Sequence, residues 1–458
     1  MKTSPAPTLT DPRALIDAAP LGKFQWQIFV LCFFVTLFDG FDTQAIAYTG
    51  PAIASAFNLG PSELTPLIVA GTVGMALGAI SLGSLGDRMG RRPAILLAVL
   101  VFGIFSLATG FARSPNEILL ARFFTGLGMG GAIPAVLSLV SEFAPARHRG
   151  LVITGVLLGL PTGAIGGGLL GAQLLSHIGW EGIFMVGGIL PLIYLLILSA
   201  RLPESPFFLA VQDLPRHRQK ITALLGKVLP AVDEAALRTA SFVMPGESVR
   251  ASFRMLVKPR FLRNTLAVWI TYFCNWAAWF MLLLWLPSVL KVGGLPPEQA
   301  ALGTVVVNSP AILFCLFMAY YLPKKPVRLL LTGTLAFGIA VALGLGLTGG
   351  MVNERWMLVF FLIGAAGVGI GLPQIALNYV VLEAYPTELR ATGAGWAIGM
   401  GRTGSIVGAA MGGWCLKAGG VAGFYYALIV PLLLAILGVL MIRTTTSATQ
   451  QNNPSESV

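Results

Sequence analysis

Apolar residues fill most of the chain in runs of about 20 positions, and short polar segments separate these runs. A helix needs ~20 apolar residues to cross ~30 Å of hydrocarbon, and formal charges are nearly absent from the runs. The pattern therefore predicts an all-α polytopic membrane protein. We expect twelve transmembrane helices, at residues 25–48, 63–85, 93–111, 116–141, 150–175, 181–200, 264–290, 298–322, 328–348, 355–382, 391–416 and 421–442.

The composition agrees with a chain that faces lipid. Of the 458 residues, 56% are hydrophobic and 11% are charged, whereas soluble domains carry about 25% charged residues. A charge near the bilayer centre costs ~2.5–3.5 kcal/mol on insertion scales. The few charges that do lie within spans are therefore candidates for function.

The polar segments divide the chain into five parts. We expect a cytoplasmic N-terminal segment at 1–24, a six-helix bundle at 25–200, a cytoplasmic central loop at 201–263, a second six-helix bundle at 264–442 and a disordered cytoplasmic tail at 443–458. The first segment has no short apolar core followed by a small-residue cleavage site, so we do not expect it to be a signal peptide.

Lysine and arginine fix the expected orientation. Of the 30 basic residues, the predicted outer segments hold only Arg113, Lys291, Arg355 and Lys417. Because positive loops stay in the cytoplasm, we expect both termini there and the chain in a bacterial inner membrane. The net charge of +11 is spread over loops, which argues against nucleic-acid binding. The four cysteines and three histidines lack ligand spacing, so we expect no metal and no cofactor. We expect a monomer in the lipid bilayer.

The two halves carry an internal repeat. At an offset of 241 residues, the run Gly126 to Gly130 aligns with Gly367 to Gly371, with glycine at every second position of both. Further matches at the same offset are Glu142 with Glu383, Pro145 with Pro386 and Arg149 with Arg390. Parallel repeats of this kind are typical of transporters in which two bundles rock about a central site.

Several motifs identify the chain as similar to a known superfamily. The segment from Gly83 to Arg92 resembles the loop signature of the major facilitator superfamily, and the repeated Glu-x6-Arg pairs and Pro203-Glu-Ser-Pro resemble its sugar-porter-like branch. The second copy of the loop signature, expected at 321–328, lacks its Gly and Asp. The resemblance implies gating at the cytoplasmic helix ends, for which the candidates are Gly83, Asp87, Arg88, Gly90, Arg91, Glu142, Arg149, Glu383 and Arg390.

A narrower resemblance comes from residues inside the spans. Asp39-Gly-Phe-Asp42, Arg122-Phe-Phe-Thr-Gly-Leu-Gly and Gly401-Arg402-Thr-Gly are similar to motifs of the aromatic acid:proton symporters. The resemblance extends over most of residues 20–442 and implies import of a hydroxybenzoate-type carboxylate together with protons.

Four formal charges lie well inside the predicted spans, and elementary chemistry gives each a role. Asp39 and Asp42 are spaced i,i+3 and share one helix face, which must point to a cavity rather than to lipid. Two adjacent carboxylates in a medium of low dielectric cannot both ionise cheaply, which suits proton coupling. Arg122 and Arg402 offer planar forks to an anionic solute. The sequence leaves open which arginine binds it, or whether either only neutralises an aspartate.

An aromatic solute needs flat apolar walls with a few polar groups. Tyr272 and Trp276 in the seventh span, and Gln374 and Asn378 in the tenth, are the candidates for this wall. The main alternative is a proton symporter of a sugar or an aliphatic organic acid, and drug efflux and a receptor role are further alternatives. We do not expect an enzyme, because no nucleophile, metal cluster or phosphate loop is apparent.

Overall fold

The computed structural model describes residues 9–10, 12–212, 215–228, 241–242, 253–321, 326–349 and 352–442. Nearly all of these residues are helical. Two short strands, β1 (Leu9–Thr10) and β2 (Ser241–Phe242), pair in parallel. The predicted disordered tail at 443–458 and the departure from the loop signature at 322–325 lie outside the described residues.

The N-terminal bundle consists of six helices, with a small helical cluster at one end. Its long helices are α2 (Lys23–Ala56), α3 (Pro61–Met89), α4 (Arg91–Gly110), α5 (Pro115–Phe143), α6 (Ala146–Leu157) and α7 (Gly159–Arg201). The cluster contains α1 (Pro12–Ala18), α8 (Pro206–Val211) and α9 (Pro215–Val228).

The C-terminal bundle follows a short helix, α11 (Phe253–Leu256). Its elements are α12 (Pro259–Val292), α13 (Pro297–Tyr321), α14 (Val327–Leu347), α15 (Trp356–Ala366), the π-helix η1 (Gly367–Gly371), α16 (Pro373–Ala384), α17 (Thr387–Ala427) and α18 (Ile429–Met441).

Two of these helices each contain a reversal rather than a straight run. Gly179 in α7 has φ 67° and Gly420 in α17 has φ 61°, a conformation that glycine adopts without steric cost. Each glycine therefore separates two of the predicted spans. Within the residues searched, nine stretches are long and apolar enough to cross a membrane, and two of them, Ala146–Arg201 and Thr392–Met441, include these reversals. With α13 added, every predicted span has a helical counterpart, and the predicted fold class is confirmed.

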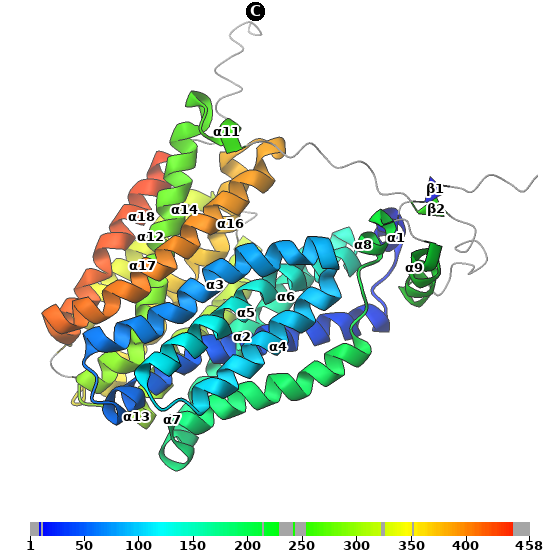
Figure 1. Ribbon diagram of the computed structural model, residues 1–458. Helices are drawn as coiled ribbons and strands as arrows, with labels where there is room; N and C mark the ends of the chain where they lie inside the picture. Colours follow the sequence, from blue (N-terminus) through cyan, green and yellow to red (C-terminus); the bar gives the residue numbers. More distant parts are fainter. Residues whose placement is uncertain are drawn as a thin grey trace, which may run out of the picture.

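The two bundles lie side by side and diverge toward one end (Figure 1). We call this the basic end, because Arg91, Arg149 and Arg390 lie there, and we call the opposite end the far end. At the far end the bundles touch: Lys291 Nζ donates to Pro51 O at 2.8 Å, and Gly413 packs closely against Thr65. The contacts between bundles that the structure describes thus gather at the far end.

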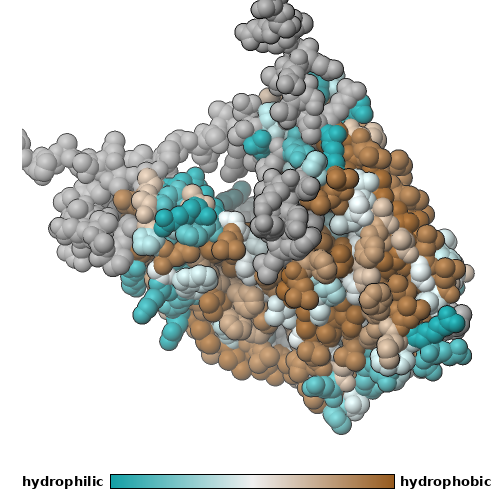
Figure 2. Space-filling view, turned by 180° about the vertical axis from the view of Figure 1, so that it is seen from behind, coloured by the Kyte–Doolittle hydropathy of each residue, from teal (hydrophilic) through white to brown (hydrophobic). Residues whose placement is uncertain are grey.

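The outer surface of the bundles is apolar. Figure 2 shows a broad hydrophobic band with hydrophilic residues at both ends. Ile80, Leu347 and Phe361 are each more than 70% exposed, which a water-facing surface disfavours and a lipid-facing surface requires.

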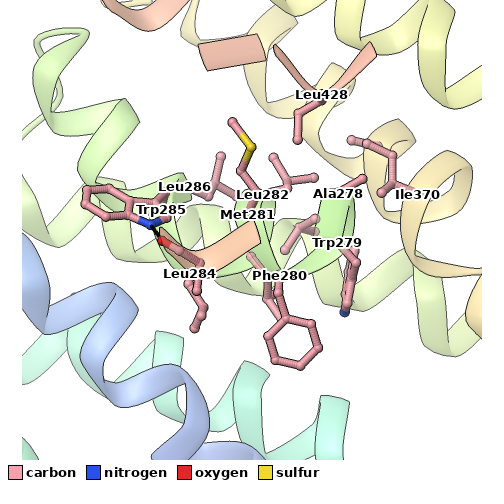
Figure 3. Packing of buried hydrophobic residues seen from close by; sticks show 14 of the residues in the cluster. Ala278, Trp279, Phe280, Met281, Leu282, Leu284, Trp285, Leu286, Ile370 and Leu428 are labelled. Atoms are coloured by element: carbon pink, nitrogen blue, oxygen red, sulfur yellow. Dashed lines mark hydrogen bonds between the residues drawn. The ribbon is translucent and has the colours of Figure 1, made fainter. Parts of the chain in front are cut away.

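Helix α12 is the most deeply buried long helix of the C-terminal bundle (Figure 3). Its segment from Ala278 to Leu286 is buried without interruption, and the indole of Trp285 donates to Ala409 O of α17 at 2.8 Å. Because α12 contacts α17 and α18 on one side and α2 on the other, it carries side chains into the space between the bundles.

Candidate functional site

A buried ion pair lies inside the N-terminal bundle. Arg122 Nη1 donates to Asp42 Oδ2 at 2.7 Å, and Nη2 donates to the backbone carbonyl of Asp42 at 3.1 Å. Ser106 donates to the second carboxylate oxygen of Asp42, and the ring of Phe184 lies 5.3 Å below the guanidinium. Asp42 is fully buried and Arg122 is 3% exposed. Together with Ser106 and Phe184, the pair connects α2, α4, α5 and α7. The positive charge of Arg122 and the negative charge of Asp42 neutralise each other.

Asp39 lies almost one helical turn before Asp42 and has fewer partners. Its Oδ1 accepts a hydrogen bond from Thr43 at 3.1 Å. Its Oδ2 is buried, and no donor among the described residues reaches it. A buried carboxylate oxygen without a donor is costly when ionised, so Asp39 is the carboxylate in this region that is best suited to take up a proton or a ligand donor.

Arg402 is the corresponding cation of the C-terminal bundle. Its guanidinium lies over the indole of Trp276, 5.3 Å from the ring centroid, and Trp276 stacks on Phe280 with 5.9 Å between centroids. No acceptor among the described residues reaches the buried Nε of Arg402. Arg402 therefore has an aromatic platform, and among the described residues it forms no ion pair with a carboxylate.

Asp39 of the N-terminal bundle and Arg402 of the C-terminal bundle lie close enough to interact electrostatically. A small cavity of about 10 Å³ is lined by Thr43 of α2 and Phe280 of α12, together with Arg122. Helices α2 and α12 run in the same direction, since their last turns meet at Lys291 and Pro51. Four residues before Thr43 and Phe280 are Asp39 and Trp276, each one turn nearer the basic end. Asp39 and Trp276 therefore lie at a similar depth, and Arg402, which lies over Trp276, interacts with Asp39 across the two bundles.

The amide and phenol side chains of the predicted wall lie on α12 and α16. Tyr272 donates to Asn378 Oδ1 at 3.4 Å. One turn before Asn378 on α16, Gln374 has a buried Nε2 for which no acceptor is described. Asn275 of α12 donates to the carbonyl of Ile370 at 3.2 Å. These side chains form the wall of the C-terminal bundle beside the platform of Arg402 and Trp276.

The predicted gate residues gather at the basic end of the N-terminal bundle. Arg91 pairs with Asp87 at 3.3 Å and with Glu142 at 3.1 Å. Gly90 between α3 and α4 has φ 105°, so the tight turn there needs glycine. The backbone N–H of Arg91 donates to Glu204 at 2.9 Å, which satisfies the N-terminus of α4. Gly83 packs against Pro134 of α5, whereas Asp87 and Arg88 are exposed.

The repeated glutamate and arginine residues find different partners in the two bundles. Arg149 pairs with Asp17 of α1 at 3.1 Å, and the same carboxylate accepts from the N–H of Ala146 at 2.7 Å. Arg390 donates to Tyr385 O at 3.2 Å, and Glu383 lies at the end of α16 with contacts of its own. Arg149 is thus bound to the N-terminal segment in this arrangement.

The sequence analysis missed several residues of these networks. Ser106 and Phe184 complete the Asp42 site, and Asp17 and Glu204 hold helix ends at the basic end. Their types are common throughout the chain, so only their spatial position distinguishes them. Within the residues searched, no cluster of three His, Cys, Asp or Glu side chains is placed to hold a metal ion.

Comparisons with known proteins give a consistent result. The family model described as Major Facilitator Superfamily matches residues 32–409. The 4-hydroxybenzoate transporter PcaK of Pseudomonas putida is 33% identical over 441 residues, covering 94% of this chain and 95% of that protein. The gallate transporter of Pseudomonas putida is 35% identical over 439 residues, covering 96% and 94%.

Solved structures share the fold at low sequence identity. A partially occluded inward-open structure of the xylose transporter XylE from E. coli superposes with a TM-score of 0.73 at 17% identity, over 93% of this chain and 99% of that one. The D-xylose-proton symporter gives a TM-score of 0.69, also at 17% identity, over 91% and 97%. These likenesses concern the arrangement of the helices.

Proposed function

The chain belongs to the Major Facilitator Superfamily and is a multi-pass membrane transporter, and on that premise we propose that it imports a small aromatic carboxylate by proton symport. The curated relatives with the highest identities quoted above transport 4-hydroxybenzoate and gallate. Both are ring carboxylates, and a site for them needs a cation beside an aromatic surface. The chemistry of the central site meets that need.

The observation that carries the proposal is the position of Arg402 over Trp276. A guanidinium forms two parallel hydrogen bonds with a carboxylate, and an indole offers a flat surface on which another ring stacks. Arg402 has a buried N–H for which no partner is described, and it interacts electrostatically with Asp39 of the other bundle. One aromatic acid bound there would contact both bundles at once.

Proton coupling is assigned to the carboxylates of α2. Asp39 has the free buried oxygen and Asp42 carries the internal ion pair with Arg122. Protonation of Asp39 removes a negative charge next to the bound anion, while protonation of Asp42 releases Arg122. Each change alters the charge balance between the bundles, which is how a proton can favour one conformation over another.

We propose alternating access because the two bundles are in contact at the far end and apart at the basic end. In the described arrangement Lys291 of α12 donates to Pro51 O and to Ser55 of α2 at the far end. The bundles diverge at the basic end. We place the basic end in the cytoplasm of a bacterial inner membrane, by the positive-inside rule, so the arrangement is inward-facing. Opening to the outside requires that the Lys291 contacts break and that the residues near Arg91, Arg149, Glu383 and Arg390 close against the other bundle.

The experiment is uptake by proteoliposomes under an imposed pH gradient. We expect labelled 4-hydroxybenzoate to accumulate when the lumen is alkaline, and a protonophore to abolish the accumulation. Xylose and succinate in the same vesicles represent the alternative, symport of a sugar or an aliphatic acid. Accumulation of either one in place of the aromatic acid overturns the proposal. Binding of the aromatic acid without any uptake indicates a receptor.

A second arm tests the aromatic platform. Trp276→Leu removes the flat surface while Arg402 keeps its charge, so affinity for 4-hydroxybenzoate should fall by about 1 kcal/mol or more. Trp356, an exposed tryptophan at the start of α15, supplies the matched control as Trp356→Leu. An equal effect of both substitutions on binding would remove Trp276 from the site.

A further inference from the structure

The helix that carries Gln374 is distorted next to the central site. Between α15 and α16, the N–H of Leu372 donates to Gly367 O at 3.2 Å, a bond to the fifth residue back. Residue 373 is proline, which has no N–H to donate. The missing N–H of Pro373 leaves the carbonyl of Gly369 without its usual donor, and the next carbonyl, that of Ile370, accepts a side-chain hydrogen bond from Asn275 of α12 at 3.2 Å.

This bond fixes which way the Asn275 amide points. Only the NH₂ group can donate to a carbonyl, so the oxygen must be the free end. Oδ1 of Asn275 is buried in a residue with no exposed surface, and no donor among the described residues reaches it. Buried amide oxygens nearly always have a partner in folded proteins. Asn275 is therefore an acceptor held in place by the backbone of the neighbouring helix.

Gln374 has a hydrogen-bond donor without an acceptor, whereas Asn275 has an acceptor without a donor. Gln374 lies four residues after Ile370, one helical turn further along the same side of the helix. Its Nε2 is buried without an acceptor among the described residues. Gln374 lies between two points where its helix contacts α12, namely Ile370 with Asn275 and Asn378 with Tyr272. The free acceptor of Asn275 and the free donor of Gln374 therefore belong to the same interface between α12 and α16.

A hydroxyl group is the chemical complement of this arrangement. It donates through its hydrogen and accepts through its oxygen, whereas a carboxylate would only accept and would gain more from Arg402. We propose that Asn275 and Gln374 form a subsite that recognises a hydroxyl on the ring of the carried acid. Asn275 Oδ1 accepts the hydroxyl hydrogen and Gln374 Nε2 donates to the hydroxyl oxygen. The inference rests on the proposed function, whose substrate class it narrows to hydroxylated aromatic acids.

The subsite should discriminate against benzoate, because an acid without a ring hydroxyl leaves the Asn275 and Gln374 side chains unpaired. A site built to hydrogen-bond a substrate hydroxyl rejects the analogue that lacks it, because its buried polar groups then stay unpaired. We expect the wild-type protein to bind its preferred monohydroxybenzoate on the order of 10- to 100-fold more tightly than benzoate. The preference should depend on ring position, since both amides are fixed to helices.

The test is equilibrium binding in detergent, with 4-hydroxybenzoate, 3-hydroxybenzoate and benzoate as probes. Gln374→Met keeps the length of the side chain and removes the donor. This variant should weaken the preferred hydroxybenzoate by about 10-fold and change benzoate affinity less than about 3-fold, so the selectivity shrinks. Unchanged selectivity in Gln374→Met, or equal weakening of all three acids, overturns the inference.

Two further variants keep the test decisive. Asn275→Leu should abolish the selectivity as well, but it also removes the bond to Ile370 and is interpreted only if its thermal unfolding matches that of wild type. Asn308→Leu is the matched control, because Asn308 is a buried amide that donates to Thr304 of its own helix at 2.8 Å. Loss of selectivity in Asn308→Leu would show a general effect of removing buried amides and overturn the inference.

The failure of the inference can be told apart from failure of the proposed function. If wild type binds benzoate and both hydroxybenzoates equally, the subsite is refuted while an aromatic-acid site remains. If wild type binds none of the three acids, the proposed function fails, and the subsite fails with it.

Discussion

The two buried arginines sit on similar platforms in different bundles, and they differ in one respect. Arg122 and Arg402 each lie 5.3 Å from the centre of an aromatic ring, Phe184 and Trp276 respectively. Arg122 has a carboxylate partner, Asp42, at 2.7 Å. Arg402 keeps a buried N–H for which no partner is described. Arg402 interacts electrostatically with Asp39 but forms no ion-pair contact with it among the described residues, so we expect its guanidinium to be available to an anion that arrives from outside.

The same contrast extends to neighbouring polar groups. In the N-terminal bundle, Ser106 supplies the last donor that Asp42 needs. In the C-terminal bundle, the free atoms of Asn275 and Gln374 lie beside Trp276. Buried polar groups without partners are rare and costly. Among the described residues such atoms lie on both sides, at Asp39 and Gln44 of α2 and at Arg402, Asn275 and Gln374 of the C-terminal bundle, so we expect the solute to be recognised where these two sets meet and not at the Asp42–Arg122 pair.

The largest effect is expected from breaking the buried ion pair between Asp42 and Arg122. Asp42→Asn leaves Arg122 buried without its counter-ion, and removal of one partner of a buried pair costs ~3–5 kcal/mol. We expect proton-driven accumulation to be lost although the protein still reaches the membrane. Uptake is measured against the amount of protein in the membrane. Wild-type accumulation by Asp42→Asn would show that this carboxylate is not needed for coupling.

The second-largest effect is expected at Arg402, whose Nε has no described hydrogen-bond partner. Arg402→Lys keeps the charge but not the planar fork, and loss of a buried charge-assisted bond costs on the order of 2–5 kcal/mol in affinity. The check is a binding cycle that compares the acid and its neutral amide in wild type and in Arg402→Ala. Coupling between the two losses is expected. Simple addition would mean that Arg402 does not contact the carboxylate, and Arg122 would become the better candidate.

The smallest expected effect lies at the basic end. Asp87 is 68% exposed and pairs with Arg91 at 3.3 Å, and exposed pairs contribute ~0.2–1 kcal/mol. Asp87→Asn should slow uptake through its role in closure and change substrate affinity little, because it lies far from Trp276. Uptake rates and affinities in detergent are compared with those of wild type. Equal losses in both would argue against a separate gate.

The sequence predicted the helices well because hydrophobic length is a local property. Each predicted span has a helix within a few residues, apart from the ends of α2 and α17, which extend several residues further. The extension of α2 to Ala56 includes Pro51. From the sequence alone, it was not possible to predict whether the helix ends at this proline or continues through it. Its carbonyl accepts from Lys291 of the other bundle, a contact that no local pattern contains.

Partners of individual charges were harder to predict than their depth. Asp39 and Arg402 were predicted to lie well inside spans, and the structure brings them close enough to interact electrostatically. The repeated spacing of Glu142 and Arg149 suggested related roles, yet Glu142 pairs with Arg91 and Arg149 with Asp17. Those choices depend on how α1 and α4 pack against α5 and α6. Such packing is set by the whole bundle and not by spacing.

The repeat also concealed a difference. Gly126 to Gly130 and Gly367 to Gly371 align in sequence, but the first run is regular α-helix and the second is a π-helix. Pro373 is the one local signal that distinguishes them, and on its own it predicts a kink rather than a π-turn. The sequence predicted Gln374 as a wall residue, but not the π-helix beside it or the hydrogen bond that fixes the Asn275 amide against Ile370.

The π-turn at Gly367–Gly371 also affects how the length of this helix can change during evolution. A π-turn accommodates one residue more than the α-helix around it, and each residue turns a helix by about 100°. Loss of a single codon within this run would therefore return it to regular α-helix and leave Gln374 and Asn378 pointing toward α12, whereas the same loss within a regular stretch of helix would turn the residues beyond it by about 100°. The glycine-rich run is thus a place where this lineage can gain or lose one residue while the recognition side chains keep their directions.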